Sequence, residues 1–546
     1  MSIVRMRKAM QGRLQHIMLG LAVVFGLGWI GISVGTNRSQ DNSDTSAVLA
    51  TINGEKVDWV EFERRVAQEI DQMEEIGDAR MLSAFEEAQI RGRLFDQTVN
   101  QMLRVQAAKN AGMKASRRDV KRKVKEIIDD QVKQIKEELL AEREGKKTDA
   151  VFEAELSKRG LSLSQIKSDI RRRIDEDQVR EQILIDKHMA KLKSGVDASD
   201  ETVRASYDEV RLAQITISGQ KRSTAQAEQR AKEVVEKLRK GADFADLARE
   251  YSEDPYKKAG GDRGRFERGA VVERELVDIA FKLKVGEASD PIKSLGSFII
   301  IKVQERRSGL PADFNDPKKK KEYREAYLAQ EQNRVIGEYE DSLRKDAQIK
   351  VNDAELRGFQ LAKEMTGMFG PSGSAQAKAK GKEAIKELQK ALEQSQGSSQ
   401  VMARVYSQIA YLYSWMRKPG FFSPTEEEQV QFRAEAKKAL QSALEYTESN
   451  DLRMLLADVC IEEREHDKAI EHLQFVSESA YDDYRIHMQI LSSYEQMKKQ
   501  GSEKAASLIA QERKWLNDYM AQMQKQQTSE MTVPFTVKPE PGGSNE

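Results

Sequence analysis

The residue with the clearest chemical potential is Asp254, a carboxylate inside the glycine-rich loop YSEDPYKKAGGDRGRFERG at residues 251–269. Two interpretations of Asp254 are open, because an Asp before a proline commonly caps a turn and can also hydrogen-bond a reacting group. Arg263 and Arg265 follow in the same loop. A pocket formed there would contain cationic side chains, which are costly to place among apolar groups.

Histidine and cysteine, the usual nucleophiles and metal ligands, are scarce in this chain. The histidines are His16, His188, His466, His472 and His487. His466 and His472 are six residues apart and do not share a helical face, which argues against a metal site. The single cysteine, Cys460, excludes an internal disulfide, and its apolar neighbours are typical of a core position. No HExxH, paired CxxC, phosphate-binding glycine loop or serine nucleophile elbow occurs, so we expect no cofactor and no metal.

The elements around the Asp254 loop alternate between strand and helix. A strand-like run, VRLAQITIS at 210–218, precedes two helical patterns, which start after Ser223 and Gly241. Beyond the loop come another helical pattern at 271–283 and a strand-like run at 297–305. This order of elements predicts a small α/β domain with the loop at its centre.

Three segments of this region resemble, in the same order, the parvulin (PpiC-type) peptidyl-prolyl isomerases. They are GADFADLAREYSEDPYKKAGGDRGRF, AFKLKVGEASDPIKS and IIIKV. The resemblance implies a parvulin-like fold for residues 206–308 and rotation of X–Pro bonds as its activity. This rotation faces a barrier of roughly 18–20 kcal/mol but breaks no bond, so it requires neither a nucleophile nor a metal. The catalyst must hold the proline ring in an apolar pocket and favour a twisted amide.

Parvulins are understood to place two histidines and a Cys or Asp in one hydrogen-bonded cluster. By this resemblance the Cys/Asp position is Asp254, whereas the two histidine positions fall on Gln214 and Ile299, and residues 206–308 contain no histidine. Gln214 is still expected to hydrogen-bond Asp254. The substrate-binding positions of the family map to Arg263, Phe266, Val271 and Leu276. Because Arg263 replaces the usual Leu, we expect weak or absent isomerase activity, and the sequence leaves open whether the chain is an enzyme.

The N-terminus predicts a membrane anchor. Residues 17–34, IMLGLAVVFGLGWIGISV, are 18 residues without a charge, preceded by a basic segment at 1–16. This run has about the minimum length of a bilayer-spanning helix, and its basic flank places the N-terminus in the cytoplasm. The alternative is a cleaved signal peptide, whose apolar region is usually shorter. Residues 35–46 are polar and are predicted to be a linker.

Three further motifs resemble the N-terminal chaperone domain of the SurA and PpiD foldases. They are ATINGEKVDWVEF, AAKNAGMKAS and SKRGLSLSQIKSDIRRRI. Gly112 is placed to end one helix and Ser116 to start the next. The resemblance implies a helical chaperone domain at 47–205, completed by a returning segment at 310–363 on the far side of the parvulin insert. It also implies apolar grooves that bind unfolded or nascent envelope polypeptides. The expected location is the bacterial inner membrane, with a single span and the bulk of the chain in the periplasm.

The pattern changes to consecutive helix pairs over residues 375–525. Ala439 and Ala469 take similar places 30 residues apart, close to the tetratricopeptide period of about 34. These observations predict a TPR-like helical-repeat domain that binds a protein partner, with a plain helical bundle as the alternative. Residues 526–546 have no periodicity and are predicted to be a disordered tail.

Composition favours a multidomain, mainly α-helical chain. With 546 residues the chain is too long to form a single hydrophobic core. Its content of 33% charged and 39% apolar residues is typical of long, solvated helices. Lys+Arg and Asp+Glu balance at 90 each, so we expect no nucleic-acid partner. Three functions are consistent with the sequence: a membrane-anchored periplasmic folding chaperone with a weak parvulin domain, an active prolyl isomerase, and an envelope assembly scaffold that acts through the TPR-like domain. We favour the first.

Overall fold

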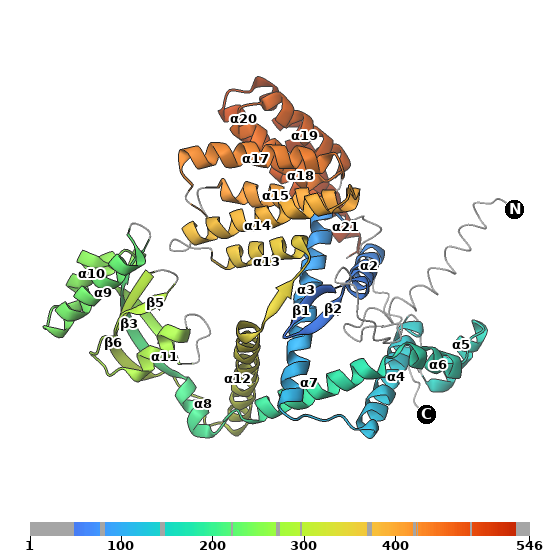
Figure 1. Ribbon diagram of the computed structural model, residues 1–546, viewed down its shortest axis with the longest axis horizontal. Coiled ribbons are helices and arrows are strands. Elements are labelled where there is room, and N and C mark those ends of the chain that lie inside the picture. The colour runs from blue at the N-terminus through green and yellow to red at the C-terminus, as the bar shows by residue number, and fades with distance from the viewer. Residues whose placement is uncertain are drawn as a thin grey trace, which may run out of the picture. The chain divides into compact units, whose positions relative to one another are not determined.

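The computed structural model describes residues 48–76, 82–141, 148–219, 222–268, 274–294, 297–368, 374–418, 422, 424–480 and 483–530 (Figure 1). Contacts between Cα atoms divide them into an N-terminal unit, which contains 48–76 and the described part of 90–353, and a C-terminal unit, which contains 82–89 and the described residues from 354 onward. The predicted anchor at 17–34 lies outside the described residues, as does 531–546. Within the described ranges, no helix combines the length and the apolar character that crossing a bilayer requires.

A three-stranded sheet with the order β2–β1–β7 joins two distant parts of the N-terminal unit. β1 (Val48–Ile52) and β2 (Glu55–Asp58) form a hairpin across Asn53 and Gly54, whose positive φ angles are those that a two-residue Asn-Gly turn needs. β7 (Ile349–Val351) pairs antiparallel with β1. A strand near the end of the unit therefore closes on its first strand.

The helices of the N-terminal unit begin and end at local sequence signals. They are α2 (Trp59–Ile76), α3 (Ala84–Asn110), α4 (Arg117–Leu139), α5 (Asp149–Lys158), α6 (Leu163–Arg173), α7 (Glu176–Ser194), α8 (Asp200–Ser206) and α12 (Pro317–Asp346). The first six residues of α3 belong to the C-terminal unit. As predicted, Gly112 follows the end of α3 with a φ of 73°, and Ser116 starts α4 in a capping box with Asp119. Ser162 forms the same box with Gln165 at the start of α6.

Ion pairs attach the segment that follows the insert to the first helices. Arg91 of α3 has a side chain that is 4% exposed, and its Nη2 donates to Glu63 at 2.6 Å and to Asp353 at 2.8 Å. Arg344 of α12 pairs with Asp96 of α3. Because a buried guanidinium is costly unless it is paired, the N-terminal unit depends on segments from both sides of the insert.

Asp119 gives this unit a pH-dependent contribution to stability. Its carboxylate accepts hydrogen bonds from Lys187 Nζ at 2.9 Å and from the N–H of Ser116 at 3.1 Å. The hydrogen bond from Lys187, followed by those from Ser116, holds the pKa of Asp119 well below its usual value. A lowered folded-state pKa stabilises the fold above the unfolded-state pKa, and this stabilisation is lost as the pH falls through the folded-state pKa.

We therefore expect Asp119→Asn to lower the urea midpoint of the N-terminal unit at pH 7. The difference from the wild type should shrink as the pH falls below about 4, where the unfolded carboxyl takes up its proton. Urea titrations followed by circular dichroism at several pH values measure both effects. Asp130→Asn is the matched control, because Asp130 is an exposed residue of the same helix. Equal effects of the two changes at every pH would contradict the assignment.

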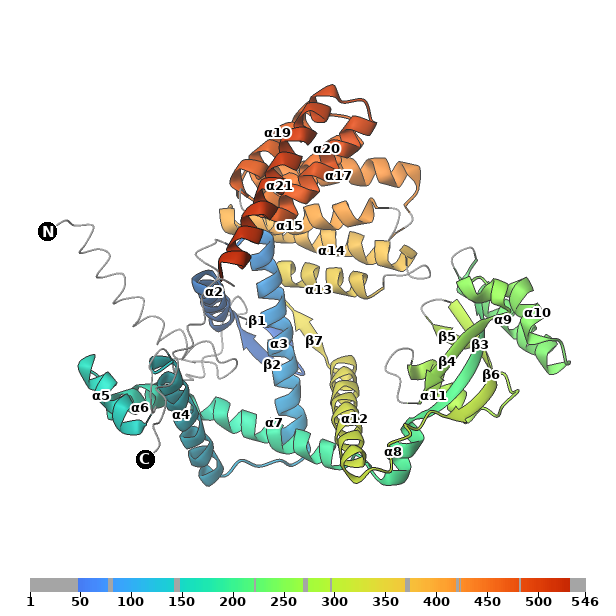
Figure 2. The same cartoon turned by 180° about the vertical axis from the view of Figure 1, so that it is seen from behind.

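The inserted domain is a four-stranded antiparallel sheet with helices on both faces (Figure 2). Its strands, in the order β4–β3–β6–β5, are β3 (Asp208–Ile217), β4 (Asp262–Glu267), β5 (Ile292–Ser294) and β6 (Ser297–Ser308). α9 (Thr224–Arg239) and α10 (Phe244–Tyr251) cover the face to which Ile215 belongs. α11 (Arg274–Lys282) covers the opposite face, to which Leu212 belongs. The predicted small α/β domain is confirmed.

The C-terminal unit is a stack of helices around one continuous apolar core (Figure 1). Its helices are α13 (Ala354–Gly367), α14 (Ser374–Gln394), α15 (Ser399–Met416), α17 (Glu426–Leu444), α18 (Asn450–Glu462), α19 (His466–Ser479), α20 (Tyr484–Lys499) and α21 (Glu503–Glu530). Each of these helices packs against the next one along the chain. Most of α13 falls in the segment 310–363 that the sequence assigns to the chaperone domain, yet within that segment Ala354 is part of the C-terminal core and Leu361 packs against it.

Cys460 of α18 lies in that core and is 1% exposed. Burial raises the pKa of its thiol to about 11, so the side chain is a neutral thiol at physiological pH. A neutral, buried thiol packs like a small apolar side chain and is a poor nucleophile.

Candidate functional site

The register of the two central strands gathers several predicted positions on one face of the inserted sheet. β3 and β6 pair with Gln214 opposite Ile301 and with Thr216 opposite Ile299. Directly opposed residues on antiparallel strands share a face, and so do residues i and i+2 of one strand. Gln214, Thr216 and Ile299 therefore lie on the face that α11 covers.

Asp254 completes a polar cluster on this face. Its Oδ2 accepts hydrogen bonds from Gln214 Nε2 at 3.2 Å and from Thr216 Oγ1 at 2.7 Å. Its Oδ1 accepts from the N–H of Tyr256 at 2.9 Å, so Asp254 also caps the 3₁₀ turn Pro255–Ala259. The expected hydrogen bond between Gln214 and Asp254 is present, and so is the capping role. Both carboxylate oxygens of Asp254 are thus engaged within the protein.

Two glycines allow the loop to approach the sheet this closely. Gly260 and Gly261 have φ angles of 67° and 84°, in the left-handed region that glycine adopts at little cost. A Cβ atom on Gly261 would lie 2.4 Å from the carbonyl oxygen of Gln214. In addition, the N–H of Gln214 donates to the carbonyl of Gly261 at 2.8 Å. Contact between Gly261 and β3 is therefore what brings Asp254 within reach of Gln214.

Arg263 occupies the position at which the parvulin resemblance implied an apolar pocket residue. Its Nη1 donates to Gln214 Oε1 at 2.6 Å. Its Cζ lies 4.7 Å from the ring centre of Tyr256 and 5.3 Å from that of Phe266. A guanidinium that is hydrogen-bonded and stacked on aromatic rings is stable in a partly buried place. Positive charge thus lies at the position where the parvulin resemblance implies apolar surface for a proline ring.

The other predicted binding positions lie beside an apolar cluster on the same face. Phe266, Leu276 and Ile299 are partly buried against core residues of β3, β6 and α11. These core residues are Val210, Leu212, Ala280, Ile301 and Val303. Val271 lies outside the described residues. The structure therefore brings together six of the seven predicted site residues, as one apolar and one polar group.

Ion pairs brace the loop on both sides of Asp254. Arg222 pairs with Glu253 at 2.6 Å, and the hydrogen bond from Arg222 lowers the pKa of Glu253. Arg211 pairs with Asp262, and its hydrogen bond likewise lowers the pKa of Asp262. Partly exposed pairs of this kind contribute little net stability and mainly fix geometry. Among the residues that the structure describes, no group of three or more His, Cys, Asp or Glu side chains is placed to hold a metal ion.

Comparison with known families assigns two parts of the chain. The model of the PPIC-type PPIase (rotamase) domain matches residues 212–305, and that of the SurA-like N-terminal domain matches residues 3–180. This chain carries a SurA-like N-terminal domain and a parvulin-type rotamase domain. Asp254, Gln214 and Arg263 all lie within the residues that match the rotamase domain.

Individual relatives agree with this assignment. Foldase protein PrsA of Caldanaerobacter subterraneus is 28% identical over 338 residues, which are 62% of this chain and 96% of that protein. Chaperone SurA of Chromobacterium violaceum is 23% identical over 343 residues, which are 61% of this chain and 72% of that protein. Foldase protein PrsA of a Geobacillus strain is 40% identical over 131 residues, which are 24% of this chain and 46% of that protein.

The rotamase domain contains two site residues that the sequence did not single out. Thr216 donates to Asp254, and Tyr256 supplies one of the rings that contact Arg263. Thr216 had a usable signal, because it follows Gln214 by two positions in a strand-like run and therefore shares its face. Tyr256 had no such signal, since its position depends on the path of the loop.

The side chains that surround Asp254 in the polar cluster of the rotamase domain donate hydrogen bonds and do not exchange protons near neutral pH. Gln214 is a neutral amide, Thr216 is a neutral hydroxyl and Arg263 is a cation. Histidine, the side chain suited to proton exchange in this range, is absent from residues 206–308. The cluster is therefore suited to fixing the Asp254 loop on the sheet and to contacting polar backbone groups.

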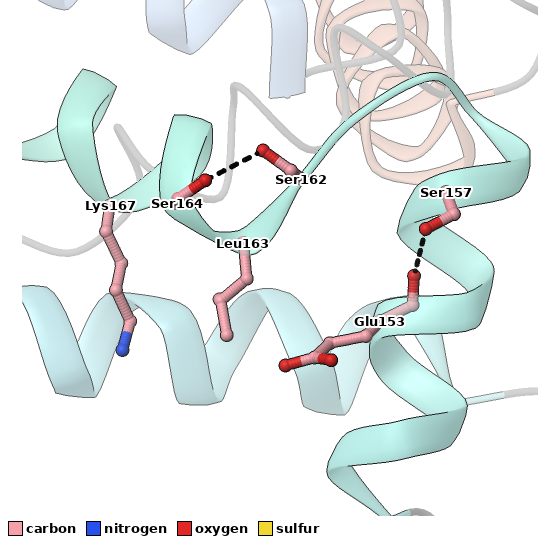
Figure 3. A pocket seen from close by; sticks show the side chains of 6 residues that line it. All are labelled: Glu153, Ser157, Ser162, Leu163, Ser164 and Lys167. Atoms are coloured by element: carbon pink, nitrogen blue, oxygen red, sulfur yellow. Dashed lines mark hydrogen bonds between the residues drawn. The ribbon is translucent and has the colours of Figure 1, made fainter.

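A depression in the SurA-like domain lies apart from this site, between α5 and α6 (Figure 3). It is lined by Glu153, Ser157, Ser162, Leu163, Ser164 and Lys167. Ser162 caps α6, and Ser157 Oγ donates to the carbonyl of Glu153 at 2.9 Å. The hydroxyls of Ser157 and Ser162 therefore support their own helices.

Proposed function

We propose that this protein is a membrane-anchored folding chaperone outside the cytoplasm, and that its rotamase domain has weak or no isomerase activity. Its clients are unfolded or newly translocated envelope polypeptides. The observation that carries the proposal is a SurA-like domain joined to a rotamase domain without a histidine, in which the parvulin resemblance assigns the two histidine positions to Gln214 and Ile299. Relatives named foldase and chaperone support the first part. The guanidinium of Arg263 among the aromatic rings supports the second.

Exposed apolar side chains in the SurA-like domain support client binding. Trp59 and Val60, in the first turn of α2, are 43% and 56% exposed, although both are apolar. Leu161, between α5 and α6, is 44% exposed. A chaperone requires such accessible apolar groups because its clients share little beyond their own exposed apolar segments.

The rotamase domain can be replaced by a short linker, because its two chain ends lie side by side, although its removal also takes away the contacts of Arg274 with Glu331 and of Tyr207 with Phe314. The N–H of Gly309 donates to the carbonyl of Tyr207 at 2.8 Å, and Asp208 pairs with Ser308 across β3 and β6. A short glycine-serine linker can therefore replace residues 206–308 without pulling α8 away from α12.

We expect this deletion to leave most of the chaperone activity intact, because the client-binding surface is assigned to the SurA-like domain. Light scattering of a chemically unfolded protein on dilution measures the suppression of aggregation by the full chain and by the deletion variant. The full chain with Asp254→Ala is the control and should match the wild type. Loss of suppression in a deletion variant that keeps its helical circular dichroism would show that the rotamase domain binds the clients.

We expect the full chain to stay with the membrane after an alkaline wash, with its bulk accessible to protease from the periplasmic side. The uncharged segment 17–34 and its basic flank are the reason. Val24→Arg places a charge in the middle of this segment and should release part of the protein, since a central arginine disfavours insertion by about 2.5–3.5 kcal/mol. A wild-type protein recovered in the soluble extract with its N-terminus near residue 36 would overturn the anchor.

The C-terminal unit supports a second candidate function, that of an assembly scaffold. We propose that α13–α21 form a TPR-like unit that binds a protein partner. Successive packing of each helix on the next supports this proposal, because such stacks produce extended binding surfaces. Removing residues 354–530, which takes away all of α13–α21, should abolish capture of the partner and spare the suppression of aggregation.

A further inference from the structure

The C-terminal unit contains a segment from the beginning of the chain. Residues 82–89 belong to this unit, although its next segment begins only at residue 354. The start of α3 is fixed by reciprocal capping. The N–H of Glu86 donates to Ser83 Oγ at 3.3 Å, and the N–H of Ser83 donates to Glu86 Oε2 at 2.8 Å. A helix start that is held in this way presents its side chains in defined positions.

An aromatic contact attaches this segment to α15. Phe85 stacks on Tyr411 of α15, with ring centres 3.7 Å apart and planes inclined by 20°. Ala84 and Ala88, one helical turn apart, are 7% and 3% exposed. Burial raises the pKa of the Tyr411 hydroxyl, in agreement with a ring that is largely shielded from water. Stacked aromatic pairs contribute about 0.5–1.5 kcal/mol beyond the burial of their surface.

Glu87 adds a polar contact two residues after the aromatic ring. Gln400 Nε2 donates to Glu87 Oε2 at 3.2 Å, and Arg404 Nη1 lies 3.9 Å from the same oxygen. Arg404 is itself held by Glu355 of α13 through two hydrogen bonds of 3.0 and 3.1 Å. This bidentate pair with Glu355 fixes the plane of the Arg404 guanidinium independently of the Glu87 carboxylate. α15 therefore presents the aromatic ring of Tyr411 and the cation of Arg404 to the first turn of α3.

We propose that the face of α15 formed by Gln400, Arg404 and Tyr411 is a docking site for the first turns of a helix with the pattern small–aromatic–x–acidic–small. Residues 82–89 of this chain are its resident occupant. The C-terminal unit is then completed by residues 82–89, which are synthesised long before the rest of the unit. Any partner or second copy that binds the same face must present this pattern and displace Phe85.

Hydrogen exchange of the full-length protein tests the contribution of the occupant. Phe85→Ala should accelerate amide exchange in 401–416 by about tenfold, because the lost stacking and burial lower the cost of opening α15. Phe85→Leu should retain part of the protection through its apolar volume. Gln89→Ala, at an exposed position of the same helix, should leave exchange unchanged. Unchanged exchange in Phe85→Ala would overturn the proposal.

Cross-linking identifies the occupant without relying on a destabilised variant. Cys460→Ser removes the natural thiol, and Glu87→Cys with Gln400→Cys places two thiols where the side chains now hydrogen-bond. A short bis-maleimide should join them within one chain. Gln89→Cys with Gln400→Cys is the control and should cross-link much less. A link between two chains would make a second copy the occupant, and absence of any link despite labelling of both thiols would exclude docking; either result overturns the proposal.

Discussion

Gly261→Ala is expected to unfold the rotamase domain or to leave it barely stable, while the rest of the chain stays folded. Gly261 has a φ of 84°, which an alanine adopts only with strain. Its new Cβ would also lie 2.4 Å from the carbonyl oxygen of Gln214 and 3.2 Å from the Cβ of Ala248. Backbone strain and overpacking together should cost about 3–5 kcal/mol, a large part of the stability of a small domain.

Amide protection in β3 and β6 as a function of urea measures this loss in the full-length protein. Gly264→Ala is the matched control, because Gly264 lies three residues later in β4 with a φ of 81°, and a Cβ added there would meet no atom within 4 Å. It should cost only about 1–2 kcal/mol, the backbone strain alone. Equal effects of the two changes would mean that the contact of Gly261 with Gln214 does not hold the loop on the sheet.

Local sequence signals were sufficient to predict the turns and helix boundaries of the N-terminal unit. Asn53-Gly54, Gly112 and Ser116 act through the backbone of their own segment, so the hairpin and the helix boundaries could be predicted without knowledge of the rest. The insertion of an α/β domain into a helical one was predictable for a different reason. Its motifs occur in the order of known foldases.

The candidate site was predictable where alternation along a strand decides which residues share a face. Gln214 and Ile299 were assigned by the parvulin resemblance, whereas alternation along β3 would have added Thr216, two positions after Gln214. The position of Arg263 between Tyr256 and Phe266 could not be predicted, because it depends on a loop path set by two left-handed glycines. Strand periodicity contains no information about such a path.

Long-range packing accounts for the remaining differences. Residues 82–89 join a unit whose other segments start at residue 354, and no local pattern connects Phe85 to Tyr411. The sequence of α13 is equally uninformative about its packing partner, because its amphipathic pattern is compatible with either unit. Its apolar face packs against α14, and this contact assigns it to the C-terminal unit. Periodicity identifies a helix and its buried face, but not the partner of that face.

The wild-type chain should leave the cis–trans isomerisation of a short X–Pro peptide near its uncatalysed rate. Asp254→Ala should change this rate little. The reason is geometric, because Asp254 is bonded to Gln214, Thr216 and the N–H of Tyr256, none of which exchanges protons near neutral pH. Strong wild-type turnover that Asp254→Ala abolishes without unfolding would instead establish an active isomerase.

Introducing the residues that the parvulin resemblance implies at positions 214, 299 and 263 should create activity that the single changes do not. The side-chain Nε2 of Gln214 lies 3.2 Å from Asp254 Oδ2, and Ile299 is opposite Thr216 on the same face. Histidines placed at positions 214 and 299 can therefore join the cluster. Arg263→Leu removes the cation from the aromatic rings and provides apolar surface for a proline ring.

We expect the triple variant Gln214→His, Ile299→His, Arg263→Leu to exceed the wild type in kcat/KM by about a hundredfold or more, measured by NMR exchange between cis and trans peptide. Each single change should give far less, because the residues of such a cluster act as a unit. Gln304→His, at an exposed position of β6 outside the cluster, is the control for an added histidine. A triple variant that folds, binds the peptide and stays at the wild-type rate would show that the missing histidines and Arg263 are not what limits this domain.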